Sequence, residues 1–173
     1  SSGKYIFILN SGDMYPKNFL MDYFLNISNS KNIYFSRVKI IDKSKNKFFF
    51  HKGRPKLLAI GMFIPHLTIC MPKNFYEKYG LYPELKFSMD FELLHKIFKK
   101  EGQGIFKEIK TRENAIFNLG GLSDLFYLES LKSNMKIIRK YGASKFKVFL
   151  LYIYFITKRF FYKQIKKILW KSH

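Results

Sequence analysis

Two polar residues directly follow the first apolar run of the chain. The run covers residues 5–9, and Asn10 and Asp13 stand in the turn-forming segment after it. A carboxylate at the carboxyl end of a parallel strand lies where open α/β sheets bind ligands, and it can hold a divalent cation that bridges the phosphates of a nucleotide. Asn, Gly and Asp are also ordinary turn residues, so Asp13 could equally cap the next helix.

A second carboxylate, Asp90, stands at the predicted start of a helix. This position suits a helix N-cap, where the macrodipole favours the ionised form. An ionised carboxylate at a cleft is also what a general base needs to accept a proton from a sugar hydroxyl. Both interpretations stay open from the residue alone. Glu92 and His95 follow within about a turn, and we expect them to be solvated or to support Asp90 rather than to react.

Two further segments have side chains or backbone suited to ligands. His66 precedes the apolar residues 67–71 and could donate to a phosphate or a sugar hydroxyl, although a core histidine is the alternative. Gly120 and Gly121 would let the backbone approach a ligand closely, and a helix beginning near Ser123 would attract anions; a plain turn is the alternative.

The spacing of apolar residues predicts a mixed α/β protein that positions these groups. Apolar runs typical of buried parallel strands cover residues 5–9 and 67–71, and polar residues 42–45 suit the turn of a β-hairpin. Helices are favoured where apolar residues recur every three to four positions and a glycine follows. We expect helices at residues 16–27, 72–79, 90–100, 123–141 and 145–171, and extended strands within residues 32–51 and 105–117.

The net charge of +20 over 173 residues indicates a polyanionic partner, either nucleic acid or an anionic membrane. The last acidic residue is Glu129, and the cations after it are unbalanced by any acid. Compositional drift towards Lys, Ile and Asn is an alternative explanation for the diffuse excess. The single cysteine, Cys70, favours a reducing compartment and excludes an internal disulfide.

The C-terminal residues 143–173 have the composition of a basic amphipathic tail. The uncharged run at residues 148–157 is too short to span a bilayer. Aromatic residues interleaved with lysines favour a helix lying in an anionic membrane surface. The alternative is a helix that packs on another part of the protein or on a second chain, and in the second case the tail would form an oligomer.

Four segments in order resemble family 2 glycosyltransferases, of the type that builds bacterial surface polysaccharides. Residues 2–13 (SGKYIFILNSGD) are similar to the family's strand ending in N-A-G-D, and residues 61–66 with 75–82 are similar to its P-H-Q and F-Y-E-K-x-G-L segment. Residues 86–94 (KFSMDFELL) are similar to its F-K-I-A-A-D-Y-E-L-L, and residues 117–123 to its F-x-x-G-G-x-S. The resemblance covers about residues 1–142.

This resemblance implies a GT-A-like fold and a metal-dependent, inverting transfer of a sugar from a nucleotide diphosphate donor, such as a UDP-sugar. Asp90 would be the general base, and Asp13 would lie at a divalent cation, Mg or Mn. Asn10, His66 and a loop of Gly120, Gly121 and Ser123 would line the donor and acceptor sites. The acceptor would be a glycan, or a lipid-linked glycan at the cytoplasmic face of the plasma membrane, where the tail would hold the enzyme peripherally.

The sequence departs from the family pattern in two ways. Asn10 and Gly12 occupy the usual acidic positions of the strand motif, which weakens the case for metal dependence. The family's nucleotide-binding half would also precede residue 1, so we expect residues 1–142 to be the C-terminal, acceptor-side part of a catalytic domain. The alternatives are an inactive remnant acting as a membrane-bound interaction piece, or a basic nucleic-acid-binding module. No motif that reads DNA or RNA is recognisable, which disfavours the latter.

Overall fold

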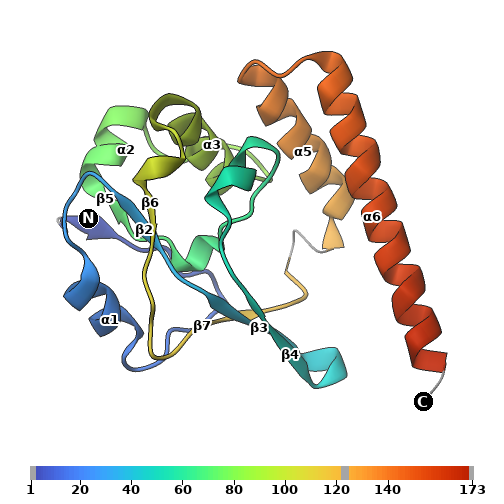
Figure 1. The fold of residues 1–173 in the computed structure, drawn as a ribbon, viewed down its shortest axis with the longest axis horizontal. Coiled ribbons are helices and arrows are strands. Elements are labelled where there is room, and N and C mark those ends of the chain that lie inside the picture. Colours follow the sequence, from blue (N-terminus) through green and yellow to red (C-terminus); the bar gives the residue numbers. More distant parts are fainter. Residues whose placement is uncertain (1–2, 122–124, 172–173) are drawn as a thin grey trace.

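The computed structural model describes residues 3–121 and 125–171, with side chains up to residue 161 apart from that of Ser44. Within these residues the chain is a mixed α/β protein with five α-helices and small mixed sheets. The strands and α1 to α3 form one body, and α5 and α6 pack along one side of it (Figure 1).

The strands form three small sheets. In the largest, β3 (Val38–Asp42) pairs antiparallel with β4 (Lys47–His51) and parallel with β7 (Ala115–Asn118). This confirms the predicted hairpin around residues 42–45. In the second, β2 (Ile33–Phe35) pairs in parallel with β6 (Phe106–Glu108). Residues 33–35 therefore belong to a different sheet from the hairpin.

Two predicted buried strands are wrong. At residues 5–9 only β1 (Tyr5–Ile6) is a strand; it is half-buried and pairs antiparallel with β5 (Met71–Pro72). Within residues 67–71 the chain forms a short 3₁₀ helix, His66–Thr68, before reaching β5. The carbonyls of Leu67 and Thr68 accept hydrogen bonds from the hydroxyls of Tyr15 and Tyr23, at 2.7 and 2.5 Å, so side chains satisfy backbone groups that a strand would have paired.

The N-terminal helix is shorter than its sequence pattern predicts. Helix α1 (Phe19–Asn26) begins three residues after Pro16. Its buried apolar residues are Phe19 and Tyr23, whereas Phe24 is 77% exposed. The predicted inward face is therefore only partly correct.

The helices bounded by glycine agree with the sequence. Helix α2 (Lys73–Tyr79) ends at Gly80, and α3 (Met89–Glu101) ends at Gly102. Both glycines have positive φ, near +87° and +77°, a conformation that costs other residues a strain energy.

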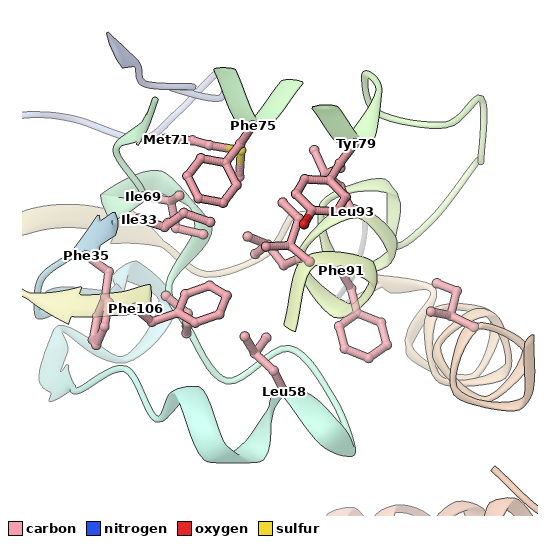
Figure 2. Close-up of a cluster of buried hydrophobic side chains, with 14 of the residues drawn as sticks. Ile33, Phe35, Leu58, Ile69, Met71, Phe75, Tyr79, Phe91, Leu93 and Phe106 are labelled. Atoms are coloured by element: carbon pink, nitrogen blue, oxygen red, sulfur yellow. The ribbon is translucent and has the colours of Figure 1, made fainter. Parts of the chain in front are cut away.

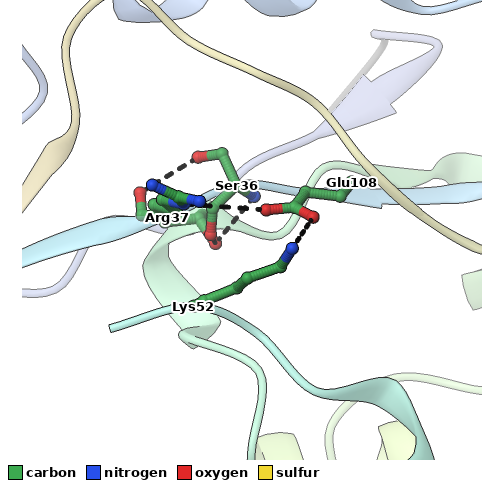
Figure 3. A network of polar contacts seen from close by, with 5 residues as sticks. Ser36, Arg37, Lys52 and Glu108 are labelled. Carbon is green, nitrogen blue, oxygen red and sulfur yellow. Dashed lines mark hydrogen bonds and ion pairs between the residues drawn. The ribbon is translucent and has the colours of Figure 1, made fainter. Parts of the chain in front are cut away.

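The main core lies between α2, α3 and the β2–β6 pair (Figure 2). Phe91, Leu94 and Ile97 of α3 point inward, as their helical spacing predicts, and Phe91 and Ile97 are fully buried. Beside this core, the Glu108 carboxylate lies 2.9 Å from the Lys52 ammonium and 4.0 Å from the Arg37 guanidinium, which links β6 to the segment after β4 (Figure 3).

The last two helices form an antiparallel pair, α5 (Tyr127–Lys140) and α6 (Lys145–Lys171), as Figure 1 shows. One face of α6 packs against the main core through residues spaced as one helical stripe: Val148, Leu151, Tyr152, Phe155 and Ile156. The opposite face exposes Phe146, Phe149, Leu150, Ile153 and Tyr154. None of the described helices, α6 included, has an apolar stretch long enough to cross a bilayer.

Candidate functional site

The structure brings together three of the residues that the sequence proposes for a ligand site. Asn10 follows the first apolar run, and His66 lies at the start of the 3₁₀ helix, 56 residues further along the chain. The Asn10 amide nitrogen Nδ2 lies 2.9 Å from His66 Nε2, within hydrogen-bond distance. The backbone bond from Asp13 N to Asn10 O, 3.1 Å long, closes the turn that carries both polar residues.

Asp13 lies half-buried beside this pair. Burial raises the pKa of its carboxyl above the ordinary value, while a hydrogen bond from the Asn118 backbone N–H and the charge of nearby His66 act in the opposite direction. The N–H of Asn118 lies 3.4 Å from Asp13 Oδ1. The carboxylate is therefore incompletely compensated, and a cation or a hydroxyl donor at this position would stabilise its charged form.

Asn118, the last residue of β7, joins the cluster although the sequence does not single it out as a site residue. Its side-chain Nδ2 donates to the carbonyl of Gly12, and its Oδ1 is buried without a hydrogen-bond partner among the described residues. A buried acceptor without a partner is uncommon in folded proteins, which distinguishes Asn118 from the other residues of β7. The available signal was its position at the end of a predicted strand, two residues before Gly120.

Hydrogen bonds hold the segment between β1 and α1 against β7 and against the 3₁₀ helix. Met14 and Ile116 exchange two backbone hydrogen bonds, 3.0 and 2.8 Å long, and Tyr15 bonds to the carbonyl of Leu67. These contacts fix the position of Asp13 relative to His66 and Asn118. We call the four residues Asn10, Asp13, His66 and Asn118 the polar cluster.

Of the predicted glycine loop, only the first part is described. Gly120 has a φ of +103°, which favours glycine, and a Cβ on Gly120 or Gly121 would meet nothing within 4 Å. The backbone therefore leaves open space beside both residues, directly after the polar cluster. Ser123, the predicted cap of the following helix, lies outside the described residues.

Asp90 occupies a different position from the predicted N-cap. Helix α3 begins at Met89 with Ser88 as its cap residue, so Asp90 is in the first turn. Ser88 adopts a left-handed conformation, φ +66°, which is uncommon outside glycine. Asp90 Oδ1 accepts a hydrogen bond from the N–H of Phe91 at 2.8 Å, a local contact that leaves Oδ2 available. No contact in the described structure joins Asp90 to Asp13.

The start of α3 lies against α5, next to the chain that leaves the polar cluster. The rings of Phe87 and Phe126 lie 5.9 Å apart, Ser88 donates to the carbonyl of Ser130, and Ser133 donates to that of Phe87. These contacts join the start of α3, which carries Asp90, to the first turns of α5.

Of the two expectations for Glu92 and His95, that they are solvated or that they support Asp90, the first is wrong. Glu92 is 7% exposed and pairs with Lys140 of α5. His95 is 2% exposed, is packed among aromatic rings, and has Nδ1 2.7 Å from the carbonyl of Leu58. Burial lowers the pKa of His95. Both residues tie α3 to its neighbours and do not reach Asp90's side of the helix as reactive groups.

The described residues hold no group of three or more acidic, histidine or cysteine side chains that could bind a metal by themselves. Mg²⁺ in enzymes is often held by one or two carboxylates together with substrate phosphates and water. Asp13, with its under-compensated carboxylate, fits a cation shared with a diphosphate but not a metal site made by the protein alone.

The chain matches no protein-family model, no curated protein and no solved structure. The resemblance to family 2 glycosyltransferases therefore depends on the four sequence segments.

Proposed function

We propose that this protein is a glycosyltransferase similar to family 2 enzymes, and that it moves a sugar from a nucleotide diphosphate to a glycan or lipid-linked acceptor. The observation that carries the proposal is the polar cluster. The resemblance assigns Asn10, Asp13 and His66 to one site, although two of them stand more than 50 residues from the third. The Asn10–His66 bond and the charge interaction between His66 and Asp13 support that assignment.

The cluster suits the diphosphate end of a donor. Asp13 would hold a divalent cation together with the phosphate oxygens, and the cation would stabilise the departing diphosphate. Asn10 and Asn118 offer amide groups for hydroxyls, and the open backbone at Gly120 and Gly121 leaves room beside them. In this proposal residues 1–142 are the acceptor-side part of a GT-A-like domain.

In this proposal Asp90 is the general base. It removes the proton from an acceptor hydroxyl as that oxygen forms a bond to the anomeric carbon, and the bond from that carbon to the diphosphate breaks. The neighbouring helix α5 has two buried side-chain oxygens without partners among the described residues, Ser130 Oγ and Asn134 Oδ1. Ser88 donates a hydrogen bond to the carbonyl of Ser130, which places this part of α5 beside the start of α3.

The outward face of α6 supports a peripheral position on an anionic membrane at the cytoplasmic side. Its exposed aromatic and aliphatic residues form one stripe, and Lys147 and Lys158 flank it. Aromatic side chains enter the headgroup boundary of a bilayer while lysines meet anionic lipid. A lipid-linked acceptor would be reached from the same surface.

The general base is tested by Asp90→Asn in the full-length protein, with donor turnover and donor affinity measured separately. We expect transfer to fall by about 100-fold or more, because general-base catalysis typically contributes a factor of that size or larger. Donor binding should change little. Glu84→Gln is the matched control, because Glu84 is exposed and lies six residues before Asp90. Near-normal transfer by Asp90→Asn would exclude the mechanism.

A further inference from the structure

The two C-terminal helices enclose an apolar groove that the proposed sugar site does not use. Its volume is about 480 Å³, and α5 and α6 contribute its walls on either side of their connecting turn. Four residues supply apolar surface: Met135, Val148, Phe149 and Tyr152. Four more surround that surface with cations: Lys132, Lys136, Arg139 and Lys145.

The cations form an ordered edge along the groove. Lys132, Lys136 and Arg139 recur at intervals of four and three residues, so they share one face of α5. They span seven residues, about 10 Å along the helix axis. Lys145 is the first residue of α6, and it lies at the end of the groove near Arg139, which donates to the carbonyl of Ala143 just before it.

No described acidic side chain forms an ion pair with any of these four cations. The neighbouring Lys140, by contrast, pairs with Glu92. Glu129 lies one turn before Lys132 on α5 and makes no ion pair with it. The four cations therefore produce a positive electrostatic potential beside the apolar surface of the groove. An anion bound there would reduce the repulsion among them.

We propose that this groove binds one molecule of a phosphate-bearing lipid, with its alkyl chain against the apolar floor and its phosphate among the cations of α5 and Lys145. A volume of about 480 Å³ lies within the range of small-molecule sites. Phe149 lines the groove and is 59% exposed on the outer stripe of α6, so a longer alkyl chain can leave the groove along that stripe. The inference does not depend on glycosyl transfer, because binding alone tests it.

The test is a calorimetric titration of the whole protein with decyl phosphate below its micellar concentration, where no membrane surface is present. We expect saturable binding of one molecule per chain that weakens as salt is added. Inorganic phosphate and decanol, titrated separately, should each bind at least about tenfold more weakly, because each lacks one of the two interactions. Equal binding by inorganic phosphate, or by decanol, would overturn the proposal, since one half of the ligand would then be irrelevant.

Two variants locate the site. Lys132→Gln with Lys136→Gln should weaken decyl phosphate binding by about tenfold, since charge-assisted contacts to phosphate are removed. Lys107→Gln with Lys110→Gln changes the net charge equally, on exposed residues away from the groove, and should leave binding unchanged. Phe149→Ser keeps every cation and should also weaken binding, while inorganic phosphate is unaffected. An equal loss of decyl phosphate affinity in the two double variants would show that the overall charge of the protein attracts the ligand, and it would overturn the proposed site. Melting temperatures confirm that each variant is folded.

Discussion

The polar cluster and the core beneath α3 each contain a histidine, and the two histidines have opposite environments. His66 lies among amide and carboxylate groups at the junction of three chain segments, whereas His95 is enclosed by Phe91, Phe98 and Tyr141 and bonds to a backbone carbonyl. The first arrangement leaves polar groups incompletely paired, whereas the second pairs the buried histidine with a carbonyl. The difference separates residues positioned for a ligand from residues positioned for stability.

The largest expected effect concerns the core. Phe91→Ala should lower the free energy of unfolding by about 3–5 kcal/mol, because Phe91 is completely buried and its removal leaves a cavity. Phe49→Ala, on a β4 residue that is 46% exposed, is the matched control, with an expected cost below about 1 kcal/mol. Urea denaturation measures both. Similar costs for the two variants would contradict the assignment of the core to α3.

The next prediction concerns the pH dependence of stability. Burial lowers the pKa of His95 in the folded protein, so the unfolded chain binds that proton more readily. The free energy of unfolding is therefore highest above about pH 6.5, the ordinary pKa of histidine. It falls at lower pH, where the unfolded chain binds a proton that folded His95 does not. In His95→Gln, denaturation between pH 5 and 8 should show a smaller loss of stability towards low pH. The loss that remains is expected from His51, because burial lowers its pKa as well. An unchanged pH profile would contradict a neutral, buried His95.

The smallest effect is expected at the polar cluster. Burial raises the pKa of Asp13, so its ionised form opposes folding at pH values above the ordinary range for aspartate. Asp13→Asn should therefore raise the melting temperature slightly at neutral pH, and this gain should vanish near pH 3, where Asp13 is protonated in both states. A clear loss of stability at neutral pH would show that Asp13 is a structural residue.

The same comparison explains what the sequence predicts well. Helices α2 and α3 follow from apolar spacing and from Gly80 and Gly102, signals that lie within each element. The β3–β4 hairpin likewise follows from its polar turn. Local patterns suffice where neighbouring residues decide the structure.

The segments around the polar cluster are determined by distant contacts. The apolar residues 67–71 suit a strand, but hydroxyl groups from Tyr15 and Tyr23, more than 40 residues away, bind the carbonyls of Leu67 and Thr68. The sequence proposes Asn10, Asp13 and His66 through a resemblance. It misses Asn118, because the backbone bonds between Met14 and Ile116 of β7 bring that residue to Asp13. The helical position of Asp90 was shifted by two residues, since Ser88 caps α3 in an unusual conformation.

The most direct test of the proposed function is the binding of a UDP-sugar to the full-length protein in the presence of Mn²⁺, measured by calorimetry. The wild type should bind, and Asp13→Asn and His66→Ala should each weaken binding by about tenfold, because each removes a charged or polar contact to the diphosphate. His51→Ala is the matched histidine control and should bind as the wild type does. Unchanged affinity in both cluster variants, or no binding by the wild type, would contradict the assignment of the polar cluster to a sugar nucleotide.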